Sequence, residues 1–478
     1  MNQQPIISIS GIRGRVGESL TWETAYYVTR LFYHLYLKKE FPLVVLGKDS
    51  RKSGEELIKG IMGAINKENL QCIYLGITTL PIMEWAVKHY QAGGGIMVTA
   101  SHNPPEWNGI KFLSSWKSGG GLLPPHLMSE IKENWREINE KAEKNEVPPP
   151  VSGYLDKYHQ EIWEEVKKVL DKLSGKKGLG ESIFTAIPGR NYRVVVDGCS
   201  IEGGKILENF LKFSGIKEVI LFNNHPVEKS ERPLEPSPEN LSQLKECIKR
   251  DRADLGFATD PDQDRLVAMP LISEEHTPLL TGKFLMELEK GNTAQPLRRI
   301  VINLSTSYAW EEISQEYGVT IDRVPVGEIN VIRRMKEVNT FFGAEGNGGV
   351  ILLPATEGRN STVGMAMLLS YLLWSGKKLE KLGEELPPYY MIKEKLRMEK
   401  NRKANEILNN IKEKIISCKA RDILKIDERD GLKIYFKDLS WIHLRPSNTE
   451  PIMRIFVEKR NAEPPEVKEI AEEIKNWL

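Results

Sequence analysis

The chain has 478 residues, enough for roughly three or four domains, and its formal net charge is only +1. This balance gives no field that would steer it to nucleic acid or a membrane surface, and no apolar run approaches the roughly 18 residues of a membrane span. Its four scattered cysteines form no CxxC pair, which argues against a zinc site or a disulfide framework; with an N-terminus unlike a signal peptide, they favour a cytoplasmic protein.

The chain opens with an apolar stretch that runs into a glycine-bracketed loop. Residues 6–16 read IISISGIRGRV, so that Gly11 and Gly14 flank Arg13. Glycine lets the backbone approach a ligand closely, although a plain glycine turn explains the same pattern. Residues 21–35 then predict a helix, because apolar side chains recur there at helical spacing.

Three short apolar strands are predicted next, at 42–46, 72–75 and 96–98. The first runs into the loop GKDSRKSG at 47–54, and the third delivers Ser101 and His102 onto a loop that Asn103-Pro104-Pro105 turns sharply. Strands that alternate with helices predict a mostly parallel sheet, which binds its ligands at the carboxyl ends of the strands. A serine held there can act as a nucleophile, although a surface turn is the alternative.

A proline-rich segment, 146–150, indicates a linker, and strands are predicted again at 193–196 and 300–303. Together with 44–49 they suggest a weak internal repeat of one α/β design. Between them, residues 254–266 read DLGFATDPDQDRL. The carboxylates of Asp260, Asp262 and Asp264 can converge on one hard cation, for which Mg²⁺ is suited. An acidic surface turn is the alternative.

A calcium loop of the EF-hand type is a rival interpretation of the three aspartates. Such a loop requires glycine at its sixth position and glutamate at its twelfth. Counted from Asp260, these positions hold Arg265 and Leu271, which excludes this type of site.

The last third of the chain carries two further polar loops. FGAEGNGGVILL at 342–353 presents Glu345 and Asn347 ahead of an apolar strand, and both side chains can bind sugar hydroxyls. A linker at 386–388 then precedes alternating helical and strand-like runs, which predict a small α+β domain. Within it, WIHLRPSNTEPIMRIFVE at 441–458 gathers groups that suit a phosphate dianion: Arg445, Ser447, Asn448 and Thr449, with Arg454 nearby.

Four of these motifs resemble those of the α-D-phosphohexomutase superfamily, whose members move phosphate between C1 and C6 of a hexose. The matching segments are GIRG at 11–14, TASHNP…NGIKF at 99–112, DPDQDR at 260–265 and RPSNTEP at 445–451. They occur in the family order along nearly the whole chain. The resemblance implies four domains around a central cleft: three similar α/β domains with mixed sheets (1–150, 151–275 and 276–385) and a C-terminal α+β domain (386–478).

The resemblance also implies a role for each candidate residue. Ser101 would carry the travelling phosphate, facing Arg13, and Asp260, Asp262, Asp264 and the phosphorylated Ser101 would hold one Mg²⁺ with Arg265 beside the same phosphate. Lys111 and His102 are the candidates for proton transfer. Glu345 and Asn347 would bind the sugar, and the loop from Arg445 to Thr449, with Arg454, would hold the phosphate that is not transferred.

This chain departs from the family pattern in the sugar loop. The usual form is G-E-x-S-G-H, but here Asn347 replaces the serine and Gly349 the histidine. The E-G-N-G-G form resembles phosphoglucosamine mutases and their phosphomannomutase-like relatives. The implied function is an isomerase that interconverts glucosamine 6-phosphate and glucosamine 1-phosphate through phosphoserine and a hexose bisphosphate.

Phosphomannomutase or phosphoglucomutase activity is the alternative, because no residue visibly recognises C2 of the sugar. A phosphosugar phosphatase and a non-catalytic phosphosugar-binding protein are more remote alternatives. No nucleic-acid or membrane partner is expected, and the oligomeric state cannot be deduced from the sequence.

Overall fold

The computed structural model describes residues 4–135, 140–292, 294, 296–398, 404–418, 422–446 and 452–477. The chain divides into two compact units, one formed by Met1–Leu297 with Asn347–Gly383 and the other by Arg298–Gly346 with Glu384–Leu478. The chain therefore passes between the units after residues 297, 346 and 383. Among the described residues, none of the helices is both long and apolar enough to cross a bilayer.

The first unit begins with a six-stranded mixed sheet in the order β1-β2-β6-β5-β3-β4. β3 pairs in parallel with β4 and β5, whereas β5 pairs with β6, β6 with β2 and β2 with β1 in antiparallel fashion. The elements are β1 (Ile6–Ser8), β2 (Gly11–Arg15), α1 (Trp22–Leu35), β3 (Leu43–Lys48), α2 (Gly54–Lys67), β4 (Gln71–Ile77), α3 (Leu80–His89), β5 (Gly94–Val98), β6 (Trp107–Leu113) and α4 (Pro125–Glu133).

The helix predicted over residues 21–35 illustrates how the sequence specifies these elements. Thr21 caps α1 by accepting a hydrogen bond from the Thr24 amide, and Ala25, Val28 and Phe32 lie on its buried face. These side chains join one apolar core with residues of α2, β3, β5 and β6. The sheet that carries the Ser101 loop is thus anchored by packing on the helices behind it.

The first unit also contains a second sheet, of four strands in the order β10-β9-β7-β8. β7 pairs in parallel with β8 and β9, and β10 closes the edge in antiparallel fashion. Its elements are α5 (Tyr154–Ser174), α6 (Leu179–Ala186), β7 (Arg193–Asp197), α7 (Ile201–Phe213), β8 (Glu218–Phe222), α8 (Ser242–Arg250), β9 (Leu255–Thr259) and β10 (Leu266–Met269). The unit is completed by α9 (His276–Glu289), β14 (Gly349–Leu352), α12 (Ser361–Ser375) and α13 (Leu379–Glu384).

In the second unit, β11 (Arg299–Asn303) pairs in parallel with β12 (Thr320–Val324) and β13 (Phe342–Glu345). The helices α10 (Ala309–Tyr317) and α11 (Glu328–Glu337) accompany these strands. The central strand thus has parallel partners on both sides, as β3 and β7 do in the first unit.

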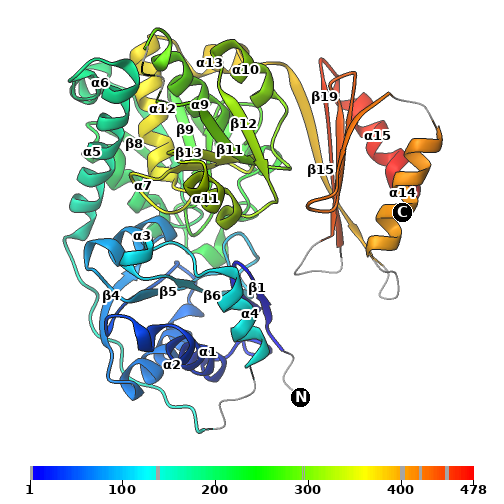
Figure 1. The fold of residues 1–478 in the computed structure, drawn as a ribbon. Helices are drawn as coiled ribbons and strands as arrows, with labels where there is room; N and C mark the ends of the chain where they lie inside the picture. The colour runs from blue at the N-terminus through cyan, green and yellow to red at the C-terminus, as the bar shows by residue number, and fades with distance from the viewer. Residues whose placement is uncertain are drawn as a thin grey trace. The chain divides into compact units, whose positions relative to one another are not determined.

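The rest of the second unit is an antiparallel sheet in the order β15-β19-β18-β17-β16, with α14 and α15 packed on one of its faces (Figure 1). Its elements are β15 (Tyr389–Arg397), α14 (Ala404–Cys418), β16 (Ile423–Asp427), β17 (Leu432–Phe436), β18 (Trp441–Pro446), β19 (Ile452–Arg460) and α15 (Pro464–Trp477). This is the α+β domain that the sequence predicts after the linker at 386–388.

The suggested internal repeat is visible where β3, β7 and β11 end. At each end a side-chain oxygen accepts a hydrogen bond from the backbone N–H two residues further on, over 2.9–3.0 Å. A buried arginine then donates to carbonyl oxygens of the neighbouring loops. The accepting residue and the arginine are Asp49 and Arg51 at the end of β3, Asp197 and Arg232 at the end of β7, and Asn303 and Arg323 at the end of β11.

Candidate active site

Ser101 lies at the carboxyl end of β5, three residues beyond Val98, and only 2% of its surface is exposed. Its φ of 52° is in the left-handed region, which costs a non-glycine residue about 1 kcal/mol or more. The Ser101 amide donates to Thr99 Oγ1 over 2.9 Å. The turn is therefore held in one conformation that presents the hydroxyl.

Two arginines fix the loop around this serine. Arg51 is fully buried, pairs with the Asp49 carboxylate, and donates to the carbonyl oxygens of Ser101 and Asn103 over 2.7 and 2.6 Å. Arg13 reaches the Asn103 side chain, 2.7 Å away. Burial lowers the pKa of Arg13 from its ordinary value, and Asp262 opposes this change.

The three predicted aspartates lie on the loop between β9 and β10, and the structure brings them to Ser101. Asp260, Asp262 and Asp264 are all fully buried, and each offers a carboxylate oxygen within 4.8 Å of the others. Ser101 Oγ donates a 2.9 Å hydrogen bond to Asp260 Oδ2. The hydroxyl predicted to carry phosphate is therefore hydrogen-bonded to one of the three carboxylates predicted to hold a cation.

Three cationic side chains surround these carboxylates. Lys111 Nζ lies 2.7 Å from Asp262 Oδ2, Arg359 pairs with Asp264, and Arg265 Nε is 3.7 Å from Asp260 Oδ2. Burial, together with the charges of Asp264 and Asp262, raises the pKa of Asp260 well above its ordinary value. Burial alone would also raise the pKa of Asp262, but the charge of Lys111 and its hydrogen bond, together with Asp260 and Arg359, lower that pKa below its ordinary value.

The carboxylates fit a divalent cation. Asp262 Oδ1 and Asp264 Oδ1 are buried and have no hydrogen-bond partner among the described residues. Buried carboxylate oxygens without partners are costly, and a hard cation that prefers oxygen ligands, such as Mg²⁺, is the group that would satisfy them. The residues present thus match the expected cofactor.

Of the two candidates for proton transfer, His102 is the one in contact with the serine hydroxyl. Its Nδ1 lies 3.4 Å from Ser101 Oγ. Lys111 instead directs its ammonium group to Asp262 and, at 3.7 Å, to Asp264. Arg265, predicted beside the phosphate, also pairs with Glu235 over 2.9 Å.

The two predicted sugar-binding residues fall on either side of the division between the units. Glu345 ends β13 in the second unit, is 2% exposed, and accepts hydrogen bonds from Asn303 Nδ2 and the Gly327 amide over 2.8 and 3.1 Å. Asn347 belongs to the first unit and is half-buried. Its Oδ1 is buried with no hydrogen-bond partner in the described part of the chain.

The structure accounts for the glycine at position 349, where the family usually has histidine. A Cβ atom added to Gly349 would collide with Arg359 Cδ and lie 3.0 Å from Arg359 Cγ. The arginine side chain therefore fills the space that a larger residue at 349 would need.

The predicted phosphate loop is only partly described. Arg445 on β18 and Arg454 on β19 are direct cross-strand neighbours, and Arg445 Nε pairs with Asp430 over 2.9–3.0 Å. Ser447, Asn448 and Thr449 lie outside the described residues. Two guanidinium groups nevertheless lie side by side on the adjacent strands β18 and β19.

Sequence reasoning assigned no role to three residues that the structure brings to the site: Arg51, Glu235 and Arg359. Arg51 lies in the GKDSRKSG segment at 47–54, so its position in a loop after a strand could have indicated a role. Glu235 and Arg359 have no local signal, because they meet the aspartate loop from 30 and 95 residues away. Only Gly349, small where the family has a bulky residue, hints at Arg359.

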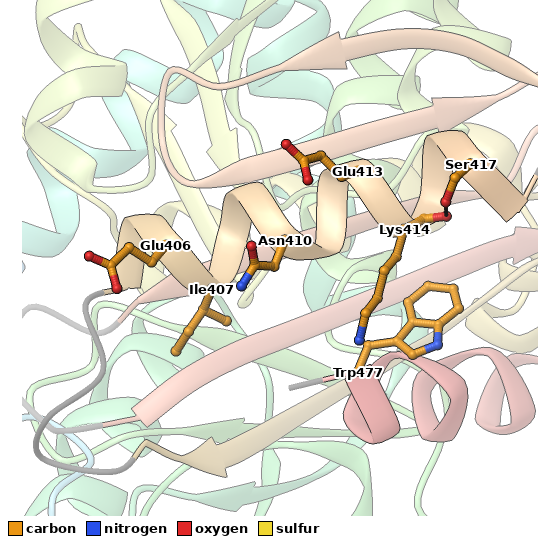
Figure 2. A pocket seen from close by; sticks show the side chains of 7 residues that line it. All are labelled: Glu406, Ile407, Asn410, Glu413, Lys414, Ser417 and Trp477. Atoms are coloured by element: carbon orange, nitrogen blue, oxygen red, sulfur yellow. Dashed lines mark hydrogen bonds between the residues drawn. The ribbon is translucent and has the colours of Figure 1, made fainter.

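A hollow of about 630 Å³ lies elsewhere, along α14. It is lined by side chains of α14 from Glu406 to Ser417 and by Trp477 of α15 (Figure 2). None of the predicted site residues lines it, so this hollow has no part in the chemistry argued below.

The chain matches four domain families, each described as "Phosphoglucomutase/phosphomannomutase". These are alpha/beta/alpha domain I over residues 6–142, domain II over 176–270, domain III over 276–390, and the C-terminal domain over 394–476. Together they span nearly the whole sequence, in the order expected of one complete set of domains.

Similar proteins agree with these matches. The chain is 33% identical to a phosphoglucomutase/phosphomannomutase of Thermococcus kodakarensis, over 95% of this chain and 94% of the relative. It is 29% identical to a "probable phosphoglucosamine mutase" of Methanopyrus kandleri, with the same coverage. The crystal structure of a phosphoglucomutase/phosphomannomutase family protein from Burkholderia thailandensis has the same fold, with a TM-score of 0.78, 18% identity, and coverage of 100% and 98%. The chain therefore belongs to the phosphoglucomutase/phosphomannomutase family and is an isomerase of the α-D-phosphohexomutase superfamily.

Proposed function

We propose that this phosphohexomutase interconverts glucosamine 6-phosphate and glucosamine 1-phosphate, and that Ser101 carries the phosphoryl group. The observation that supports this most directly is the 2.9 Å hydrogen bond from Ser101 Oγ to Asp260 Oδ2 within a buried group of carboxylates. A serine beside carboxylates that can hold a cation is the arrangement that transfer of a phosphoryl group requires.

The proposed cycle starts from phosphorylated Ser101. The bond from Oγ to phosphorus breaks, and a new bond forms from phosphorus to a sugar hydroxyl. The proton of that hydroxyl passes to a base, and Ser101 Oγ takes up a proton as it leaves. The product is a hexose bisphosphate, which turns over and returns its other phosphate to Ser101. His102, 3.4 Å from Oγ, and Lys111 are our candidates for moving the proton.

We propose that Asp260, Asp262, Asp264 and an oxygen of phosphorylated Ser101 would hold one Mg²⁺ ion. The Oδ1 atoms of Asp262 and Asp264 support this assignment, because both are buried without a hydrogen bond among the described residues. Asp264 Oδ1 has Arg265 Nε 3.8 Å away. When bound, the ion offsets negative charge on the transferring phosphoryl group. Arg13 and Arg265 complete the cationic surroundings of the phosphoserine in this proposal.

We further propose that Glu345 and Asn347 bind sugar hydroxyls, and that Arg445 and Arg454 hold the stationary phosphate together with the loop residues Ser447, Asn448 and Thr449. The cross-strand pairing of the two arginines supports the second assignment, because paired guanidinium groups suit a phosphate dianion. Asp430, which pairs with Arg445, would set the orientation of that guanidinium.

The choice of glucosamine rests on the E-G-N-G-G form of the sugar loop, and the name of the Methanopyrus kandleri relative agrees with it. The name of the Thermococcus kodakarensis relative favours a second candidate, phosphomannomutase or phosphoglucomutase activity. Measuring kcat/KM with the 1-phosphates of glucosamine, mannose and glucose separates the two. A value for mannose or glucose above that for glucosamine contradicts our first choice.

The phosphoserine is tested by following phosphate from a labelled hexose bisphosphate. We expect label on Ser101 that chases into product, and loss of turnover in Ser101→Ala. Ser129→Ala, which changes an exposed serine of α4, is the control and keeps full activity. Ordinary turnover by Ser101→Ala refutes the assignment, and release of free phosphate in step with substrate loss indicates a phosphatase instead.

A further inference from the structure

Asp262 and Asp264 are held in the same way. In each, one carboxylate oxygen, Oδ2, is paired with a buried cation: Lys111 for Asp262 and Arg359 for Asp264. In each, Oδ1 is buried and has no hydrogen-bond partner among the described residues, although Arg265 Nε lies 3.8 Å from Asp264 Oδ1. A cation that occupies one oxygen of a carboxylate fixes the direction in which the other oxygen points.

The position of Arg359 is fixed by its backbone pairing and by the packing of its side chain. Its backbone pairs with Ile351 of β14 in an isolated bridge, and the next residue, Asn360, caps α12 by accepting from the amides of Thr362 and Val363. The side chain is about 10% exposed and passes over Gly349, where an added Cβ would meet its Cδ and Cγ. The backbone of Arg359 is therefore fixed by its neighbours, and its side chain packs over Gly349.

We propose that Arg359 is a positioning residue for Asp264: it holds Oδ2 so that Oδ1 is aimed at the bound divalent cation, and Gly349 is the residue that leaves it room. This inference rests on the proposed function, because it takes the three aspartates to be the metal site. It assigns to Arg359 a role that none of the sequence motifs indicates, and to Gly349 a role other than sugar binding.

The test is Mn²⁺ binding to the full-length protein, followed by electron paramagnetic resonance. Removing the partner that orients a metal ligand typically weakens binding about 10- to 100-fold, and we expect this for Arg359→Gln. Arg359→Lys keeps the charge and is expected to lose less. An affinity within twofold of the parent refutes the proposal. Tighter binding also refutes it, because Arg359 would then be a competitor of the metal.

Gly349→Ala tests the same idea without removing the charge. The added methyl group pushes the aliphatic part of the Arg359 side chain aside. We therefore expect the single variant Gly349→Ala to bind Mn²⁺ more weakly than the parent protein. In an Arg359→Ala background the collision partner is gone, and the glycine substitution is expected to have little further effect. If Gly349→Ala weakens Mn²⁺ binding by the same factor with and without Arg359, the proposed linkage between the two residues is refuted.

Asp262→Asn distinguishes this proposal from the one on which it rests. If the parent binds Mn²⁺ and Asp262→Asn abolishes binding, the site is the aspartate loop, and the Arg359 variants decide the inference alone. If Asp262→Asn binds as the parent does, the metal lies elsewhere, and both the metal assignment and this inference fail.

Discussion

Replacing Arg51 with methionine should destabilise the protein and disturb the loop that carries Ser101. The substitution keeps an apolar stem and removes a guanidinium that has no exposed surface. It leaves the Asp49 carboxylate, 1% exposed, without its ion-pair partner. It also removes the donors to the carbonyl oxygens of Ser101 and Asn103.

The magnitude follows from these losses. Leaving one member of a buried ion pair without its partner costs about 3–5 kcal/mol, and an unsatisfied buried carbonyl about 1–3 kcal/mol. These losses overlap, so we expect a fall of about 4 kcal/mol in the free energy of unfolding. Since the two carbonyls fix the Ser101 turn, phosphorylation of Ser101 should also slow, on the order of 100-fold for a displacement of about 1 Å.

The assay is denaturant unfolding, with phosphorylation of Ser101 measured in parallel under native conditions. Arg333→Met is the matched control, because its side chain is 69% exposed and its ion pair with Glu337 spans 3.7 Å. We expect that change to stay within about 0.5 kcal/mol of the parent. Adding Asp49→Asn to Arg51→Met removes the stranded charge and should recover part of the loss.

Two results would refute this reasoning. A cost below about 1 kcal/mol for Arg51→Met would mean that the buried pair with Asp49 contributes little net stability. Some buried ion pairs behave in this way, because hydrophobic residues can replace them without loss of stability. A double variant no more stable than the single one would mean that the unpaired carboxylate is not the source of the penalty.

Two further predictions concern stability. Burial lowers the pKa of His159 in the folded protein to about 4, below its ordinary value of 6.5. As the pH falls from about 6.5 to about 4, a proton therefore binds this histidine in the unfolded chain but not in the folded one, and the free energy of unfolding decreases. His159→Phe should therefore shrink the difference in unfolding free energy between pH 7 and pH 4.5 by about 2 kcal/mol, and an unchanged difference contradicts the assignment. Gly60→Ala should lower the midpoint of thermal unfolding, because the new Cβ would collide with the Trp22 carbonyl oxygen. This loss should exceed the roughly 1 kcal/mol by which alanine is preferred over glycine in a helix. Gly189→Ala is the control and should stay near neutral, because no atom lies within 4 Å of its added Cβ.

The parts of the fold that could be predicted are those specified by nearby residues. The cap at Thr21 and the apolar face of α1 lie within one helix, and the turn at Pro104 and Pro105 follows its strand directly. The aspartate loop is likewise continuous in sequence. That Ser101 meets Asp260, 159 residues away, came only from family resemblance, since no local pattern contains that contact.

The parts that could not be predicted depend on distant pairs. The partners of Asp264 and Asp197 are Arg359 and Arg232, 95 and 35 residues along the chain, and each sits in a segment with no regular pattern of its own. A charge pair needs only two side chains in the fold, so it leaves no periodic trace in the sequence. Gly349 is informative only once the path of the Arg359 side chain is known.

The buried arginines that bond the loops beyond β3, β7 and β11 show how one scaffold supports different chemistry. The carbonyl groups beyond a parallel strand leave the sheet and need new donors, and a buried guanidinium supplies several in one plane. Arg51 supplies them to the Ser101 turn, Arg232 to Thr259 just before Asp260, and Arg323 to the loop after Asn303. Each arginine also pairs with a carboxylate, but its bonds to the supported loop go to backbone carbonyls. The loop is therefore free to present a hydroxyl in one case and carboxylates in another. The same device therefore fixes the position of the reactive groups without specifying what those groups are.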